Sequence, residues 1–423
     1  MTGLDRVDRE DPGPDAAELI AAADLEAARR AVAELALRTP VVPSSELAEL
    51  AGGAVLLKAE SLQRTGSFKI RGALNRIAAL GAAAANGLVT ASAGNHARAV
   101  AHAARAKGLA CEVFMPHDAP VSKLQAVEAL GAGVTLAGET VDEALEEAQA
   151  AAAAAGAAFV HPFDDADVIA GQATLGLELV EDVPGLARVI VPVGGGGLAG
   201  GIGIALRRSG SDAELIGVQA ELCAPVARAL DPGAGAAAGG ERVLSETTIA
   251  DGIAVKRPGR LTMPLLCELL SGVTTVTEDQ IADAMVFLAE APKLVAEGAG
   301  AAAAAALLAR ALPPAAGPTV AVVSGGNVDS GLLASLLLRH EAEQGRRVRI
   351  HTRVPDRPGG LAELLGLIAR ARANVVSVEH LREAVPLHVR ETAVELMLET
   401  RGPGHTDEVL GALAAGGYEA RID

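Results

Sequence analysis

The sequence predicts an α/β protein built on a parallel sheet, followed by a smaller domain with the strand and helix order βαββαβ. Short apolar strands alternate with Ala- and Leu-rich helices from about residue 54 to 340, which is typical of parallel sheets covered by helices. Polar, glycine-containing turns follow several of these strands. Because ligands of such folds bind at the carboxyl ends of strands, we expect these turns to form the functional site.

The composition narrows the class of protein. The chain has 423 residues, half of them apolar, but only five Phe, one Tyr and no Trp. A net charge of −17 and the lack of stacking side chains make nucleic acid an unfavourable partner. The sequence shows neither a signal pattern nor an uninterrupted apolar run long enough for a membrane span. The three cysteines form no CxxC pair, so we expect a soluble, cytoplasmic protein with free thiols.

The elements can be predicted in chain order. Residues 1–17 are rich in Asp, Gly and Pro and are expected to be disordered, whereas 19–37 has the spacing of one amphipathic helix. The Ala runs at 81–85, 150–155 and 301–306 are predicted to be helical. Strands are expected at 54–57, 87–91, 111–116, 134–136, 188–193, 215–219 and 319–323, and helices at 73–80, 97–107, 121–130 and 141–155 and after the glycines at 194–201.

Lys69 is the first candidate catalytic residue. It lies in Ser67–Ala73, between a predicted strand and a predicted helix, and so at or just inside the helix N-terminus. A cation is unfavourable there, and a positive field lowers the pKa of an amine and favours its neutral, nucleophilic form. For a single lysine, an ordinary solvated side chain is the simpler interpretation. Whether Lys69 is reactive or merely solvated therefore depends on which groups the other turns supply.

Three more turns carry polar side chains or exposed backbone N–H groups. Ser92–His96 follows one strand and supplies an amide, and Ser324–Asn327 follows another and supplies a hydroxyl. Four successive glycines, Gly194–Gly197, expose backbone N–H groups at a helix start, which is a cradle for a phosphate. Each turn taken alone is also compatible with a purely structural role. Together with Lys69 they match the needs of pyridoxal phosphate: an amine, a phosphate seat, and polar partners for the ring.

A nicotinamide-dependent oxidoreductase is the alternative from another class. Gly195–Gly200 matches the pattern G-x-G-x-x-G, and Glu221 follows the next strand, where a dinucleotide fold places its ribose-binding acid. A third possibility is an amino-acid-sensing protein whose larger part has lost its activity.

Seven motifs resemble the pyridoxal-phosphate-dependent threonine/serine dehydratases, also called threonine ammonia-lyases. They lie at 67–73, 92–96, 161–165, 194–198, 251–256, 297–300 and 324–327. The resemblance covers about residues 20 to 340. It implies the fold type II of these enzymes, like the tryptophan synthase β subunit, with a catalytic domain at 18–340 and a smaller subdomain at about 55–160 within it. Arg98-Ala99 departs from the Gln-Gly that family members often carry.

The resemblance also implies roles for individual residues. Lys69 would hold the cofactor and act as the base, Asn95 would lie beside its phenolic oxygen, and Ser324 would bond its ring nitrogen. The remaining cofactor contacts would be Phe68, Gly194, Gly195, Gly196, Gly197 and Leu198. The substrate contacts would be Ser92, Ala93, Gly94, Asn95 and His96. No metal ligand is predicted.

The implied reaction is an elimination. L-threonine would give 2-oxobutanoate and ammonia, and L-serine would give pyruvate. Asn95 and Ser324 are neutral, so neither forces the ring nitrogen to stay protonated, which suits elimination better than transamination. The resembling serine racemases carry a serine where this chain has Ala93, so we expect little racemisation.

The C-terminal segment is predicted to be a separate domain, 348–423, after a charged linker at 341–347. Its order βαββαβ is that of a ferredoxin-like fold. Asp356–Leu361 resembles the first turn of ACT-type regulatory domains, which implies an amino-acid effector, isoleucine or valine, at Pro358, Gly359, Gly360 and Leu361. A structural or dimerising role is the alternative. We expect a homodimer or homotetramer.

Overall fold

The computed structural model of the chain describes residues 15–230, 248–381 and 390–422. They form two compact units, the first ending at Asp329 and the second beginning at Ser330. Most of the predicted disordered tail lies outside the described residues, but Ala16 and Ala17 already belong to a helix. Among the described residues, no helix is both long enough and apolar enough to cross a membrane.

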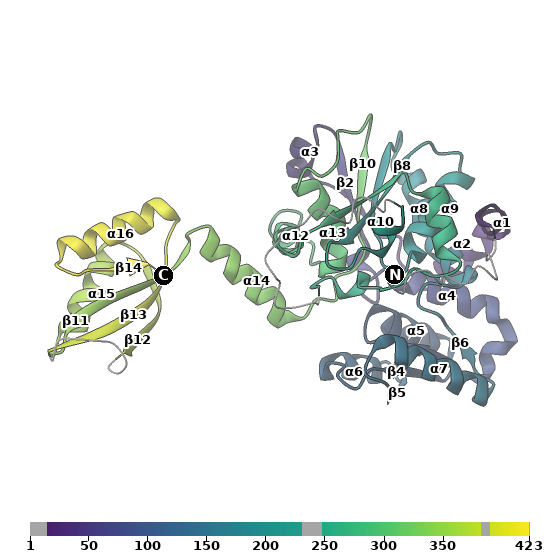
Figure 1. Cartoon of the computed structure of the whole chain (residues 1–423), viewed down its shortest axis with the longest axis horizontal. Coiled ribbons are helices and arrows are strands. Elements are labelled where there is room, and N and C mark those ends of the chain that lie inside the picture. Colours follow the sequence, from purple (N-terminus) through teal and green to yellow (C-terminus); the bar gives the residue numbers. More distant parts are fainter. Residues whose placement is uncertain (1–14, 231–247, 382–389, 423) are drawn as a thin grey trace, which may run out of the picture. The chain divides into compact units, whose positions relative to one another are not determined.

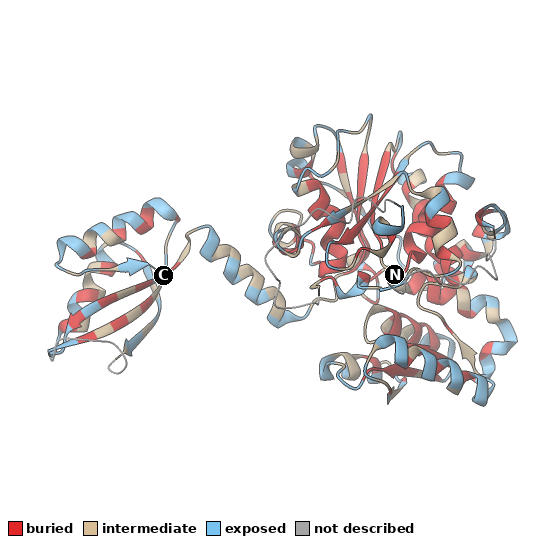
Figure 2. Cartoon of the chain, in the orientation of Figure 1, coloured by how far each residue is buried: buried red, intermediate tan, exposed pale blue. Residues whose placement is uncertain are grey.

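The larger sheet of the first unit has six strands in the order β1-β2-β10-β7-β8-β9 (Figure 1). All neighbours are parallel except β1 and β2. The strands are β1 (Val41–Pro43), β2 (Val55–Ala59), β7 (Arg188–Pro192), β8 (Glu214–Ala220), β9 (Gly272–Val276) and β10 (Thr319–Val323). Helices cover both faces of this sheet, and β7 and β10 are therefore buried at every position (Figure 2).

The smaller sheet has four parallel strands in the order β5-β4-β3-β6. They are β3 (Leu88–Ala91), β4 (Cys111–Met115), β5 (Gly133–Leu136) and β6 (Ala158–Phe159). The strand at 55–59 pairs with β10 in the larger sheet, so the sheet of the smaller subdomain begins at residue 88 instead of about 55. An apolar run does not reveal which of two sheets it joins.

The helices follow the predicted alternation with two differences. The helix expected over 19–37 is two helices, because Ala23 is extended and the Asp24 side chain caps the second one. The Ala run at 81–85 forms a 3₁₀ helix, η2 (Gly81–Asn86). The α-helices are α1 (Ala16–Ala22), α2 (Leu25–Ala33), α3 (Ser45–Ala51), α4 (Lys69–Leu80), α5 (Asn95–Lys107), α6 (Val121–Glu128), α7 (Val141–Ala155), α8 (Ala166–Asp182), α9 (Gly197–Arg208), α10 (Pro225–Leu230), α11 (Thr262–Leu269), α12 (Glu278–Glu290) and α13 (Gly298–Leu308); η1 (Glu60–Leu62) and η4 (Asp251–Ile253) are short 3₁₀ helices.

Helices α4, α8 and α9 pack unusually closely, and this fixes the start of α4. A Cβ atom on Gly171 of α8 would lie 2.6 Å from the carbonyl oxygen of Arg71, and one on Gly201 of α9 would lie 2.6 Å from that of Ile169. Side chains larger than hydrogen would push these helices apart. The first turn of α4, which carries Lys69, is therefore held against the core of the unit by backbone contact.

The second unit has the predicted order βαββαβ after an initial helix. Its antiparallel sheet has the order β12-β13-β11-β14, with one face buried against the helices. The elements are α14 (Ser330–Glu343), β11 (Arg347–Pro355), α15 (Gly360–Arg370), β12 (Asn374–Leu381), β13 (Glu391–Glu399), α16 (Pro403–Ala415) and β14 (Arg421–Ile422). The linker predicted to start at Glu341 instead begins as the last turn of α14, so only residues 344–346 separate helix and strand.

Candidate active site

Lys69 is the first residue of α4, as the sequence predicted. The turn before it is tied to the turn after β10, because Phe68 N donates to Ser324 O (3.1 Å) and Ser67 forms a β-bridge with Gly325. The Lys69 amine donates to Pro162 O at 2.8 Å and lies 5.2 Å from the centroid of the Phe68 ring. Burial lowers the pKa of Lys69 to about 8, although the charge of Glu297 opposes the shift. A nucleophilic amine is thus available close to neutral pH.

The glycine loop between β7 and α9 has room for backbone only. Gly196 has φ +93°, and a Cβ atom on Gly195 would come within 2.3 Å of the Phe163 ring. Thr262 Oγ1 holds the loop by donating to Gly195 O (2.6 Å). The first N–H groups of α9 have no carbonyl partners within the helix, as at every helix start. The loop is therefore a preformed cradle for an anion.

Ser324 lies directly after β10, next to the ends of β2 and β7 in the sheet. Its side chain is buried, and within the described part of the chain its hydroxyl makes no hydrogen bond. The following glycine is required, because Glu297 Oε1 would lie 2.3 Å from a Cβ atom on Gly325. The hydroxyl is thus free to bind a ligand at the same sheet edge as Lys69.

The turn after β3 leads into α5, whose first residue is Asn95. Gly94 N donates to Ser92 Oγ (3.1 Å), which shapes the turn. His96 is buried and its Nε2 donates to Val160 O (3.0 Å). Burial, followed by the charge of Lys69, lowers the pKa of His96 to about 3. His96 therefore stays neutral and supports the turn instead of acting as an acid.

Asn95 belongs to a hydrogen-bonded chain of side chains that the sequence did not reveal. Its Nδ2 donates to Glu297 Oε1 (2.6 Å), and its Oδ1 accepts from Asn327 Nδ2 (2.6 Å). Asn327 Nδ2 also donates to Thr65 O (2.8 Å), and Arg98 donates to Asn327 Oδ1. Burial, reinforced by the charge of Asp251, raises the pKa of Glu297 to about 7. Glu297 and Asn327 stood in predicted motifs, but nothing in their spacing indicated this contact.

His161 shapes the loop that receives the Lys69 amine. Its Nδ1 accepts from Phe163 N (3.2 Å) and Asp164 N (2.8 Å), so the ring folds the chain around Pro162. Burial lowers the pKa of His161 to about 4, which keeps Nδ1 free to accept. A neutral histidine here is a structural support for the lysine.

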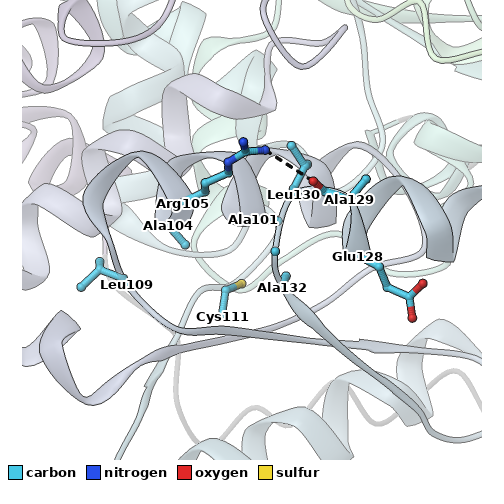
Figure 3. Close-up of a pocket in the computed structure, with 10 residues that line it drawn as sticks. Ala101, Ala104, Arg105, Leu109, Cys111, Glu128, Ala129, Leu130 and Ala132 are labelled. Carbon is cyan, nitrogen blue, oxygen red and sulfur yellow. Dashed lines mark hydrogen bonds between the residues drawn. The ribbon is translucent and has the colours of Figure 1, made fainter.

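A cavity away from these groups offers no competing nucleophile. It measures about 230 Å³ and lies between the C-terminal ends of α5 and α6, where Arg105 donates to Ala129 O at 3.4 Å (Figure 3). Cys111 lines it, but burial and the charge of Glu112 raise the pKa of this thiol to about 12. Such a thiol is not a nucleophile near neutral pH. Among the described residues no group of acidic, His and Cys side chains has the arrangement of a metal site.

The fold and the site together define an α/β enzyme that uses a partly buried lysine amine beside a backbone cradle for an anion. A family model described as "Pyridoxal-phosphate dependent enzyme" matches residues 32–325, and the chain belongs to this family. The enzyme therefore depends on pyridoxal phosphate. This finding overturns the nicotinamide alternative for Gly195–Gly200 and Glu221. Glu221 follows β8 as an exposed residue.

Relatives of known activity match most of the chain. It is 45% identical to "L-threonine ammonia-lyase" of Thermotoga maritima over 405 residues, 96% of this chain and 100% of that protein. It is 42% identical to the protein of the same name from Geobacter sulfurreducens, covering 90% of this chain and 94% of that one. Among solved structures, a threonine deaminase from T.th. is 39% identical with a TM-score of 0.65, covering 72% of this chain and 98% of that one. The maize serine racemase is 32% identical with a TM-score of 0.68, and the match covers 76% of this chain and 99% of that one. The predicted fold type is confirmed by these matches.

The residues present fit pyridoxal phosphate. At Gly194–Gly197 a Cβ atom at any of the four positions would come within 3.0 Å of a neighbouring atom, so only bare backbone lines this seat for a phosphate at the start of α9. The Ser324 hydroxyl has no partner in the described structure, and the Lys69 amine has a lowered pKa. An anion seat, a free hydroxyl and a reactive amine are what the phosphate, the ring nitrogen and the aldehyde carbon need.

Proposed function

We propose that this protein is a threonine ammonia-lyase that converts L-threonine to 2-oxobutanoate and ammonia, and L-serine to pyruvate. The observation that carries the proposal is the partly buried Lys69 amine, with its pKa lowered to about 8, at the sheet edge that also holds the glycine cradle and the Ser324 hydroxyl. The names of the relatives from Thermotoga maritima and Geobacter sulfurreducens, and the share of each chain that they cover, support the same activity.

Each site residue has a defined role in this proposal. Lys69 holds the cofactor, with Phe68 beside it, and Gly194–Leu198 binds its phosphate through backbone N–H groups. Asn95 donates to the phenolic oxygen, and Ser324 bonds the ring nitrogen. Because a hydroxyl carries no charge, Ser324 does not fix a proton on that nitrogen as a carboxylate would. When bound, pyridoxal phosphate supplies an electron-withdrawing ring that weakens the bonds at the α-carbon of the substrate.

Lys69 is the base of the reaction. In its neutral form, which a pKa of about 8 makes accessible, the amine takes the α-proton. The turn Ser92–His96 binds the substrate carboxylate at the start of α5, where backbone N–H groups favour an anion. Loss of the β-hydroxyl as water and hydrolytic release of ammonia complete the conversion with no net oxidation or reduction.

The function is tested by a substrate panel. The purified protein, loaded with pyridoxal phosphate, should be yellow and should release 2-oxoacid from L-threonine and L-serine but not from D-threonine. L-Alanine, which lacks a leaving group, is the matched negative control. A yellow protein that produces no 2-oxoacid from L-threonine at any pH between 7 and 9 contradicts the proposal, since an elimination must work in the range where Lys69 becomes neutral.

The second unit is proposed to bind an amino-acid effector. Gly359 has φ +93°, and α15 begins at Gly360, where a Cβ atom would lie 2.4 Å from Pro355 O. The turn at Pro358–Leu361 thus presents bare backbone at a helix start, which suits a carboxylate. Isoleucine is the first candidate because 2-oxobutanoate feeds its synthesis, and valine is the second. We place this ACT-like enzyme in the cytoplasm as a homodimer or homotetramer.

Calorimetric titration of the full chain tests the effector. Isoleucine or valine should bind, whereas D-isoleucine should not. The effector should change the affinity of the protein for threonine, and threonine should change the affinity for the effector by the same factor. A chain ending at Glu343, where α14 ends, should keep its activity and lose the response. Binding of isoleucine to that shortened chain contradicts the placement of the site.

A further inference from the structure

Arg98 marks a departure of this chain from the pattern it resembles, and the structure gives it a place. It lies on the first turn of α5, three residues after Asn95, and is partly buried. Its guanidinium donates to Asn327 Oδ1, which lies beyond the end of β10. The side chain thus reaches from the smaller subdomain to the edge of the larger sheet, next to the proposed cofactor site.

The direction of every hydrogen bond from Arg98 onward is determined. A guanidinium can only donate, so the amide of Asn327 must turn its oxygen toward Arg98. Its nitrogen then has two hydrogens, one for Thr65 O (2.8 Å) and one for Asn95 Oδ1 (2.6 Å). The amide of Asn95 is fixed in turn, with its oxygen toward Asn327 and its nitrogen toward Glu297 Oε1 (2.6 Å).

This arrangement leaves one hydrogen on Asn95 Nδ2 for a ligand. An amide nitrogen has two hydrogens, and Glu297 takes one of them. A phenolic oxygen that carries negative charge needs a donor, so Asn95 must present its nitrogen and not its oxygen. Thr65 O, which can only accept, favours the same orientation of Asn327. A glutamine at position 98 has both a donor and an acceptor and would not reinforce that orientation, whereas an arginine, which only donates, does.

We propose that Arg98 is a positioning residue that, together with Thr65 O and Glu297, holds the amide orientations of Asn327 and Asn95 and thereby strengthens cofactor binding. The inference rests on the proposed place of Asn95 beside the phenolic oxygen. Arg98 itself touches neither cofactor nor substrate in this proposal. Its effect passes through two amides whose orientations a donor at one end and an acceptor at the other determine.

The experiment measures the dissociation constant of pyridoxal phosphate from the full chain by titrating the apoenzyme, together with the visible absorbance of the bound cofactor. Arg98→Met removes all donors and should weaken binding about tenfold, the effect of losing one oriented hydrogen bond to a charged atom. Arg98→Lys keeps a donor-only group and should restore most of the affinity. Arg105→Met, two turns further along α5 and beside the cavity of Figure 3, is the control and should bind like the parent protein.

A double-mutant cycle separates this role from a general structural one. If Arg98 acts only through Asn95, Arg98→Met should change the dissociation constant in the parent but not in the Asn95→Ala background. Equal losses in both backgrounds overturn the proposal, as does unchanged binding by Arg98→Met in the parent. If Asn95→Ala itself binds the cofactor with unchanged affinity and absorbance, Asn95 does not lie beside the phenolic oxygen, and the proposed role of Arg98 is overturned as well. That result would not contradict the role of Lys69 or the proposed activity. Should Arg98→Met not fold, Arg98→Gln replaces it in the cycle, with a loss smaller than tenfold expected in the parent only.

Discussion

Two cations on the first turn of α4 lie in opposite environments. The Lys69 amine donates to a backbone carbonyl and lies over the Phe68 ring, and burial lowers its pKa to about 8. Arg71, unlike the partly buried Lys69, is fully buried, and its guanidinium binds Glu60 at 2.8 Å and Glu178 at 2.7 Å. Burial opposes the charge of Arg71, but these two carboxylates outweigh it and raise its pKa above the ordinary value.

The difference shows how one helix start serves both chemistry and stability. Residues two apart on a helix point roughly 200° away from each other, so Lys69 and Arg71 face different surroundings. Lys58, also fully buried, binds Glu178 at 2.6 Å and so belongs to the same ion cluster as Arg71. The acids lie on the side of Arg71, which anchors the helix, while the side of Lys69 keeps its amine close to neutrality. A cation can be held charged or made reactive by the choice of neighbours alone.

The largest effect should follow from removing the reactive cation. Lys69→Ala should abolish the cofactor absorbance and lower 2-oxoacid release by more than about 10⁴-fold, because both the covalent attachment and the base are lost. Lys69→Arg, which keeps the charge but cannot become neutral, should be equally inactive. Borohydride reduction of the loaded parent protein followed by peptide mapping should label Lys69, and a label on another lysine would refute its role.

Removing the anchoring cation should affect stability instead of chemistry. Arg71→Met leaves the fully buried Glu60 without its cation and removes one of the two cations that bind Glu178, and we expect the free energy of unfolding to fall by about 3–5 kcal/mol. Arg76→Met, on the same helix and partly exposed, is the matched control and should cost about 1 kcal/mol or less. Urea unfolding measures both. A loss for Arg71→Met no larger than for Arg76→Met would contradict the comparison.

Glu297 offers a test through pH. It is the acid whose charge acts on Lys69, yet it bonds Asn95 and not the amine. Its pKa is raised by burial from 4.5 to about 7, so between these values the folded protein binds more protons at this site than the unfolded chain. Its contribution to stability is therefore fully present below pH 4.5 and is lost as the pH rises toward 7.

The slope from this one group is at most about 1.4 kcal/mol per pH unit. Glu297→Gln, which keeps the amide contact but cannot ionise, should unfold with a flatter pH dependence between pH 5 and 7. Urea midpoints of the apoenzyme at several pH values measure the slope. An identical slope in the variant would show that Glu297 is already ionised in this range.

The meeting of the candidate turns at one sheet edge could be predicted from the sequence, for a physical reason. Lys69, Gly194–Gly197 and Ser324 follow three strands of one sheet, and parallel neighbours bring such turns to the same edge. The predicted alternation of strands and helices was also confirmed, because the spacing of apolar residues within each element indicates its type without reference to the rest of the chain. The order βαββαβ in the second unit was confirmed because one-sided strands and amphipathic helices are visible in its sequence.

The contacts that the sequence did not reveal join distant positions through single side chains. Asn95 and Glu297 are separated by 202 positions, and Arg98 and Asn327 by 229. No local pattern records such a pairing. The same holds for the sheet to which strand 55–59 belongs and for the break at Ala23, where one capping side chain, Asp24, outweighs a continuous helical pattern. Local rules predicted the turns, and tertiary packing decided which side chains meet in them.

The smallest expected effect concerns the stereochemistry of proton transfer. If Lys69 is the reactive amine of the site, a proton removed from the α-carbon can return only from the same side, so the product is 2-oxoacid and not the D-amino acid. Racemisation needs a second proton donor on the opposite face, and Ala93, at the position where the resembling serine racemases carry a serine, has no proton to give. Ala93→Ser should therefore raise the formation of D-serine from L-serine by about tenfold, equivalent to about 1.4 kcal/mol, while pyruvate release stays within a small factor of the parent.

The control for this change is Ala93→Val, which adds volume but no donor and should not racemise. Chiral chromatography of the amino-acid pool during turnover measures D-serine, and pyruvate release is followed in the same samples. If the parent protein already forms D-serine as fast as pyruvate, a second proton donor exists that is not at position 93, and Lys69 is not the only reactive group of the site.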